Sequence, residues 1–130
     1  MSSYAAGRFP SLGAGSAVLA FDVGGTDMKA ALVDDAGSIV DIVRVPTPID
    51  RERTAETVVT RIGELARDLR RNHPDVHPQA AGLLVPGHVN DASGVGVFSE
   101  NLGWSNYPFR DRAEATLGVP VAFGHDVRGA

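Results

Sequence analysis

The stretch with the clearest chemical character is residues 18–29, which read VLAFDVGGTDMK. A short apolar run leads into Asp22, and Gly24, Gly25 and Thr26 follow almost at once. Consecutive backbone N–H groups in a glycine turn form a concave site for an anion, because no side chain blocks the approach. Thr26 adds a hydroxyl donor, and Asp22 can hold Mg²⁺, directly or through water, beside phosphate oxygens. These residue types at this spacing predict a phosphate site.

The local pattern around this stretch is that of a hairpin. The apolar runs over residues 18–23 and 28–33 predict two strands, and the glycines between them predict a tight turn with positive φ. Two common phosphate motifs, G-x-x-x-x-G-K-S/T and G-x-G-x-x-G, are absent. On spacing alone, an ordinary hairpin turn with a solvated aspartate therefore stays open as an alternative.

The composition sets the class of protein. A chain of 130 residues with 43% hydrophobic and 22% charged residues predicts one globular domain. Its net charge of −4 argues against a general role on nucleic acid or a membrane surface, since both favour a basic face. The absence of cysteine excludes disulfides and a thiol nucleophile. No apolar run approaches the roughly 20 residues of a membrane span. We therefore expect a cytoplasmic protein.

The elements that must position the turn can be read along the chain. The small, Gly- and Ser-rich residues 1–16 predict a disordered tail, and residues 17–130 predict one domain. A β-branched run over residues 39–45 predicts a third strand of an antiparallel meander. A helix follows over residues 51–71, with Asp50 as its N-cap. Further elements are then expected as a strand at 80–85, a short strand at 95–97, a helix from Pro108 to Gly118, and a strand at 119–123.

This order, β-β-β-α-β-(β)-α-β, predicts an α/β fold with a mixed sheet, the arrangement of a ribonuclease H-like, actin-like ATPase lobe. In open α/β sheets, ligands bind at the carboxyl ends of the strands. Three features are expected to meet at that edge. They are the Asp22 turn, the Pro86-Gly87 turn after the fourth main strand, and the pair His125-Asp126 after the last strand.

Several residues near this edge suit sugar chemistry. Asp126 is the best candidate for a general base that accepts a proton from a substrate hydroxyl, although it could instead cap a following helix. Asn101 offers both a donor and an acceptor, which suits vicinal sugar hydroxyls, or it is a turn residue. Trp104 can stack on a sugar face or simply bury area in the core. His73 and His77 lie four apart, but Pro74 and Pro78 argue against a shared helical metal site.

Four motifs together resemble a known family. The segments FDVGGT (residues 21–26), VPG (85–87), SENLGW (99–104) and GHD (124–126) are similar, in order and spacing, to the N-terminal lobe of the ROK family of repressors, open reading frames and sugar kinases. The resemblance covers residue 18 to the end. It implies an actin-like fold and phosphorylation of a hexose such as glucose by ATP or polyphosphate. It places Asp22, Gly24, Gly25 and Thr26 in the phosphate site, and it also assigns four sugar-side residues: Gly87, Asn101 and His125 near the sugar, and Asp126 as the catalytic base.

The sequence departs from the family pattern at several positions. Asp27 stands where the family usually has lysine, and strand alternation puts Lys29 on the same face, where it can substitute in part. His88 replaces a usual proline. Gly124-His125 replaces a usual Glu-Asn, which puts the identity of the sugar in question more than the class of reaction.

The resemblance also implies parts that lie outside these 130 residues. The family's second lobe carries the adenosine-binding loops, a Cys-His zinc site and further sugar contacts. We therefore expect little kinase activity from this chain alone, and a sugar kinase using ATP with Mg²⁺, a sugar substrate and possible homodimerisation for the complete protein. Two alternatives are a non-catalytic sugar-sensing module and a ribonuclease H-like nuclease that uses Asp22 and Asp126 to hold two metals.

Overall fold

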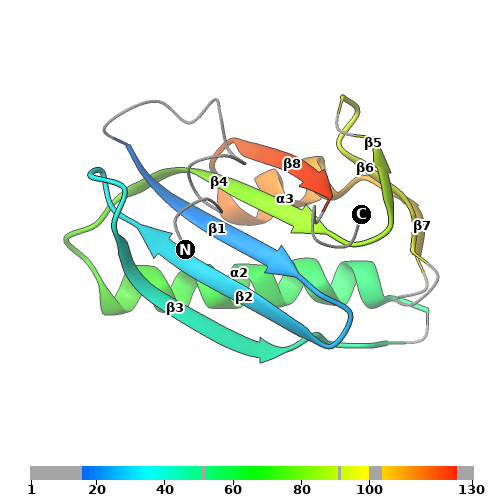
Figure 1. Ribbon diagram of the computed structural model, residues 1–130, viewed down its shortest axis with the longest axis horizontal. Coiled ribbons are helices and arrows are strands. Elements are labelled where there is room, and N and C mark those ends of the chain that lie inside the picture. The colour runs from blue at the N-terminus through cyan, green and yellow to red at the C-terminus, as the bar shows by residue number, and fades with distance from the viewer. Residues whose placement is uncertain (1–15, 51, 91, 100–103, 126–130) are drawn as a thin grey trace.

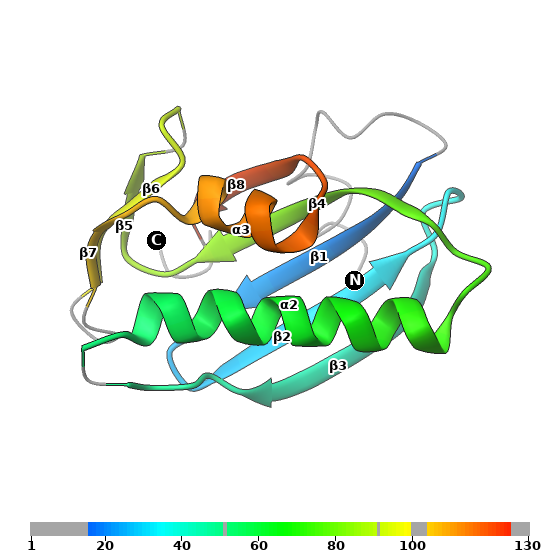
Figure 2. The ribbon, with the colours of Figure 1, turned by 180° about the vertical axis from the view of Figure 1, so that it is seen from behind.

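The computed structural model of the chain describes residues 16–50, 52–90, 92–99 and 104–125. A five-stranded sheet carries both described helices on one face, and a second sheet of three short strands lies at one end of the first (Figures 1 and 2). The tail predicted over residues 1–16 falls almost wholly outside the described residues. Neither described helix is long and apolar enough to cross a bilayer.

The first three strands form the predicted antiparallel meander. They are β1 (Ala17–Val23), β2 (Asp27–Val33) and β3 (Ile39–Pro46). All seven residues of β1, the central strand of the sheet, are buried. The turn between β2 and β3 is closed by Asp34, whose Oδ1 accepts hydrogen bonds from the N–H groups of Ala36 and Ser38.

Helix α2 (Thr54–Asn72) starts three residues later than the sequence predicts, and the prediction of Asp50 as its N-cap is wrong. The cap residue is Arg53. Asp50 contributes its backbone carbonyl instead, which accepts hydrogen bonds from the hydroxyl of Thr54 and from the N–H of Arg53. The chain therefore makes a closed turn before the helix begins, and the side chain of Thr54 fastens that turn.

The parallel part of the sheet follows the predicted crossovers. Strand β4 (Pro78–Val85) lies parallel to β1, and β8 (Val121–His125), reached through α3 (Phe109–Leu117), lies parallel to β4. The strand order is β3-β2-β1-β4-β8. Helix α3 ends at Gly118, as predicted, with φ of 75° and its N–H bonded to the carbonyl of Glu114.

Side chains alternate between the two faces of the sheet. Leu19, Phe21 and Val23 of β1 belong to the core beneath the helices, together with Ile62 and Leu69 of α2. The intervening residues of β1 point to the opposite face, where Val18 and Ala20 belong to two smaller apolar clusters. By the same alternation, Asp22 lies on the face away from the helices.

The second sheet is the main feature that the sequence did not predict. It consists of β5 (His88–Asn90), β6 (Val95–Ser99) and β7 (Trp104–Tyr107), in that spatial order. The sequence predicted one short strand and a polar loop at 99–104. Strands of three to five residues leave too few positions for a clear alternating pattern.

Trp104 attaches this second sheet to the core. Its side chain is 5% exposed, and its ring lies edge-on to Phe109 with the ring centroids 4.7 Å apart. Gly96 of β6 lies so close to the same cluster that an added Cβ would stand 2.7 Å from the ring of Phe109. Trp104 is therefore a core residue, and the alternative role as a stacking platform for a sugar is wrong.

Candidate functional site at the carboxyl edge of the sheet

The carboxyl ends of β1, β4 and β8 point to the same end of the molecule, and the small sheet lies at that end as well (Figures 1 and 2). The β1–β2 turn, the turn after β4 and the last residue of β8 are therefore gathered at one edge, as the strand order predicts. Two of the candidate residues on these segments, Asp22 and Gly87, are more than 60 residues apart in the sequence.

One row of the sheet connects these segments. Hydrogen-bonded pairing sets Arg44 of β3 opposite Lys29, Lys29 opposite Asp22, Asp22 opposite Leu84, and Leu84 opposite Gly124. Neighbouring strands lie about 4.8 Å apart, so Asp22 and Gly124, two strands apart, are separated by about 10 Å. The row therefore joins a charged end at β3–β2–β1 to the end of β8.

A polar pocket of about 210 Å³ opens beside the β1–β2 turn. Asp22 in this pocket is only 4% exposed. Met28 is fully buried between Asp27 and Lys29, so these two charged residues share a face, as predicted. The pocket includes every predicted phosphate-site residue except Gly25, and its lining is Asp22, Gly24, Thr26, Asp27, Lys29 and Arg44.

The turn itself differs from the prediction. Neither Gly24 nor Gly25 has positive φ. The N–H of Gly24 donates to the carbonyl of Asp27 at 2.8 Å, so it closes the hairpin and does not face an anion. Glycine is needed at position 24 because an added Cβ would stand 2.7 Å from that same carbonyl oxygen. The amides that remain for an anion are those of Gly25 and Thr26, which form no hydrogen bond with other described residues.

Thr47 supports this turn, and the sequence reasoning missed it. Its hydroxyl donates to the carbonyl of Gly24 at 2.8 Å, and its N–H donates to the carbonyl of Thr26 at 2.8 Å. The side chain is one of the few buried polar groups, with 5% exposure. The available signal is a threonine between two prolines, Pro46 and Pro48, a pattern that indicates the end of a strand and not a hydrogen bond to a distant turn.

The predicted sugar-side residues are described only in part. Gly87 is exposed, has φ of 88°, and lies two residues beyond Val85, whose register partner is His125. Gly87 and the backbone of His125 therefore lie at neighbouring strand ends. Strand β8 runs to His125, two residues further than predicted. Asn101 and Asp126 lie outside the described residues.

The residues of the pocket fit a magnesium ion that arrives with phosphate. The described residues contain no group of three His, Cys, Asp or Glu side chains that could hold a metal alone. Mg²⁺ usually needs only one or two carboxylates beside phosphate oxygens and water. Asp22 lines this pocket, so its carboxylate supplies that number.

The two histidines that lie four apart do not form a shared site. His73 caps the C-terminal end of α2, and its Nε2 lies 2.8 Å from Oδ2 of Asp41 on β3. This hydrogen bond is the main cause that lowers the pKa of Asp41 below its ordinary value. The Asp41–His73 pair fastens the helix to the edge strand and lies on the helix side of the sheet.

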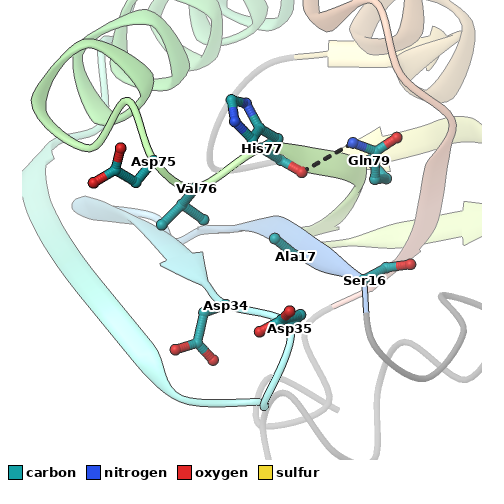
Figure 3. A pocket seen from close by; sticks show the side chains of 8 residues that line it. All are labelled: Ser16, Ala17, Asp34, Asp35, Asp75, Val76, His77 and Gln79. Carbon is teal, nitrogen blue, oxygen red and sulfur yellow. Dashed lines mark hydrogen bonds between the residues drawn. The ribbon is translucent and has the colours of Figure 1, made fainter.

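A second pocket of about 260 Å³ lies at the opposite end of the sheet. Figure 3 shows Asp34, Asp35 and Asp75 around it, and His77, whose backbone carbonyl accepts a hydrogen bond from Gln79. Its lining contains three aspartates and neither lysine nor arginine. A phosphate would be repelled there, so the pocket with Lys29 and Arg44 is the one that suits an anion.

The strand order and the crossovers define one lobe of the actin-like ATPase fold, a class that solved structures confirm. A ROK glucokinase from Streptomyces griseus, solved with glucose and AMPPNP, superposes with a TM-score of 0.71 at 28% identity and covers 83% of this chain and 32% of its own. A ROK hexokinase from Thermus thermophilus gives 0.70 at 30% identity, covering 84% and 35%. A ROK transcriptional regulator gives 0.73 at 18% identity, covering 88% and 28%, and shows the fold alone.

The sequence model of the ROK family matches residues 18–130, and the chain belongs to that family. A glucokinase from Streptomyces coelicolor is 33% identical over 109 residues, which are 84% of this chain and 32% of the relative. An N-acetylmannosamine kinase from Escherichia coli is 29% identical over 113 residues, 86% of this chain and 36% of the relative. The chain thus spans about a third of the length of these relatives.

Proposed function

We propose that this chain is the N-terminal, substrate-side lobe of a sugar kinase that transfers a phosphoryl group from ATP or polyphosphate to a hexose such as glucose. The observation that carries the proposal is the row of paired residues from Lys29 and Asp22 to Gly124. This row lies beside both the pocket that suits an anion and the end of β8, at the same edge of the sheet. The kinases among the relatives support the same reaction class.

On the phosphate side, each residue has a distinct part. The amides of Gly25 and Thr26, which have no partner among the described residues, and the hydroxyl of Thr26 are donors for phosphate oxygens. Lys29 supplies a positive charge in the same pocket. Asp22 would hold Mg²⁺, which when bound neutralises charge on the transferred phosphoryl group.

On the sugar side, Gly87, Asn101 and His125 are proposed to contact the hexose. Asp126 directly follows His125 at the end of β8. A carboxylate there accepts the proton of the attacking hydroxyl as the phosphoryl group arrives. The exposed backbone at Gly87 leaves room for a sugar, since glycine has no side chain to fill that space.

Phosphoryl transfer depends on holding donor and acceptor in line, and this chain offers only one side of that arrangement. We propose that these 130 residues alone turn over little or no hexose. A purified chain of this length with normal turnover in a coupled assay would contradict that part of the proposal.

The proposal is tested by expressing the complete reading frame and assaying a panel of hexoses with ATP and with polyphosphate. Asp126→Asn should lower kcat by about 10²- to 10⁴-fold, the usual contribution of a general base, while hexose binding persists. Asp75→Asn, in the pocket at the opposite end, is the matched control and should leave kcat unchanged.

Two outcomes would overturn the proposal. Wild-type kcat in the Asp126→Asn variant would remove the general base from this position. A wild-type protein that binds a hexose but phosphorylates none of the panel would instead favour the alternative role of a sugar sensor.

A further inference from the structure

We propose that Arg44 of β3 is a further phosphate-binding residue of this site, and that Asp27 holds its guanidinium at the pocket until phosphate takes it over. The proposal rests on the proposed function and names a residue that the family motifs did not point to. Arg44 lies 18 residues after Thr26 in sequence, outside every motif that predicted the site.

The register places Arg44 at the pocket. It pairs with Lys29 of β2, which in turn pairs with Asp22 of β1, so the three side chains stand in one row on the same face of the sheet. That face is the one away from the helices, and Arg44 is among the residues that line the pocket. No rearrangement of the backbone is needed to bring its side chain to the turn.

The contact between Arg44 and Asp27 is an exposed and loose ion pair. Nη1 of Arg44 lies 3.7 Å from Oδ2 of Asp27, which is too long for a hydrogen bond, and the two side chains are 63% and 50% exposed. Such pairs contribute little to stability. The pair restrains the guanidinium near the pocket while leaving it able to exchange Asp27 for a stronger partner.

Phosphate is that stronger partner. A guanidinium can donate two parallel hydrogen bonds to a phosphate group, and these charge-assisted bonds are stronger than a separated surface ion pair. Among the described residues, the charged groups that line the pocket are Asp22, Asp27, Lys29 and Arg44, and their formal charges cancel. With Asp22 on Mg²⁺, Lys29 and Arg44 face the remaining phosphate charge together.

Asp27 is expected to oppose phosphate binding in two ways. Its carboxylate competes with phosphate for Arg44 and repels phosphate directly. Removing its charge should therefore strengthen phosphate binding, whereas removing Arg44 should weaken it. If Asp27 acts partly through Arg44, the effect of Asp27→Asn should shrink once Arg44 is gone, so the two changes are not additive.

The test measures binding of Mg²⁺-AMPPNP, and separately of tripolyphosphate, to the protein from its complete reading frame by titration calorimetry. Arg44→Gln should weaken both ligands by roughly tenfold, since both present the same phosphates, and leave hexose affinity unchanged. Asp27→Asn should strengthen both by about threefold. Arg71→Gln removes the same charge from an exposed pair on α2 and should change affinity less than about twofold.

The results separate the role of Arg44 from the proposed phosphate site. Unchanged phosphate affinity in Arg44→Gln, with the wild type binding both ligands, overturns the role of Arg44 and leaves the proposed function standing. Equal losses in Arg44→Gln and Arg71→Gln also overturn it, because the effect is then one of net charge. A wild-type protein that binds neither ligand overturns both this inference and the proposed phosphate site.

Discussion

In the β1–β2 turn, a Cβ atom added to Gly24 would lie 2.7 Å from the carbonyl oxygen of Asp27, whereas one added to Gly25 would meet nothing within 4 Å. Both residues have φ outside the left-handed region. The fold therefore requires glycine at position 24 for steric reasons, and it does not require glycine at position 25.

This difference predicts the stability of two neighbouring variants. Gly24→Ala should lower the free energy of unfolding by about 1–3 kcal/mol, because backbone atoms on both sides of the contact would have to move apart. Gly25→Ala should change it by less than about 0.5 kcal/mol. Urea denaturation of the two variants beside wild type measures this, and equal losses at both positions would contradict the described turn.

Some residues of the candidate site could be predicted from the sequence, and others could not. Asp22, Gly24 and Thr26 were predictable because adjacent residue types carry the chemistry, and all three line the pocket. Thr47 and Arg44 were not predictable, because their relevance depends on β3 pairing with β2 in one register. A pattern read along the chain cannot show which residue of a neighbouring strand will stand beside the turn.

At the scale of elements, α2 is tied to the sheet at its end by Asp41 and His73. The hydrogen bond from His73 lowers the pKa of Asp41 from 3.8. A carboxylate whose folded-state pKa is lowered stabilises the fold above its unfolded pKa, and this stabilisation is lost as the pH falls through the folded-state value.

The Asp41–His73 hydrogen bond therefore predicts that the difference in stability between wild type and Asp41→Asn depends on pH. Wild type should be more stable than Asp41→Asn at pH 5, and the difference should shrink as the pH falls below the ordinary value of 3.8. His73→Ala should remove the same acid-dependent part. Urea denaturation between pH 2.5 and 5.5 measures this, and a difference that stays constant across that range would refute the role of the pair.

Long elements were predictable and short ones were not. The apolar spacing of α2 and the continuous apolar run of β4 are strong signals, and both elements were expected within three residues of their observed bounds. Of the small β5–β7 sheet only β6 was expected, as a short strand at 95–97, because these strands owe their structure to tertiary contacts. Among these contacts is the packing of Trp104 and Gly96 against Phe109 of α3.

At the scale of the whole molecule, the sheet has two different ends. The end with the strand carboxyl termini holds Lys29 and Arg44 beside Asp22, whereas the other end holds a pocket with three aspartates (Figure 3). A negatively charged donor should distinguish them, since among the described residues that line the two pockets lysine and arginine occur only in the first. The chain spans about a third of its relatives, so a bound donor is expected to contact this lobe only in part.

The phosphoryl donor is expected to bind at the β1–β2 turn. The most direct measurement is amide hydrogen exchange of the protein from its complete reading frame, with and without Mg²⁺-AMPPNP and a hexose. The N–H groups of Gly25 and Thr26 have no partner among the described residues, so we predict fast exchange without ligand and marked slowing with it. Residues 34–38 and 75–79, at the opposite pocket, should not change. Unaltered exchange at Gly25 and Thr26, or slowing at the opposite pocket instead, would contradict donor binding at the β1–β2 turn.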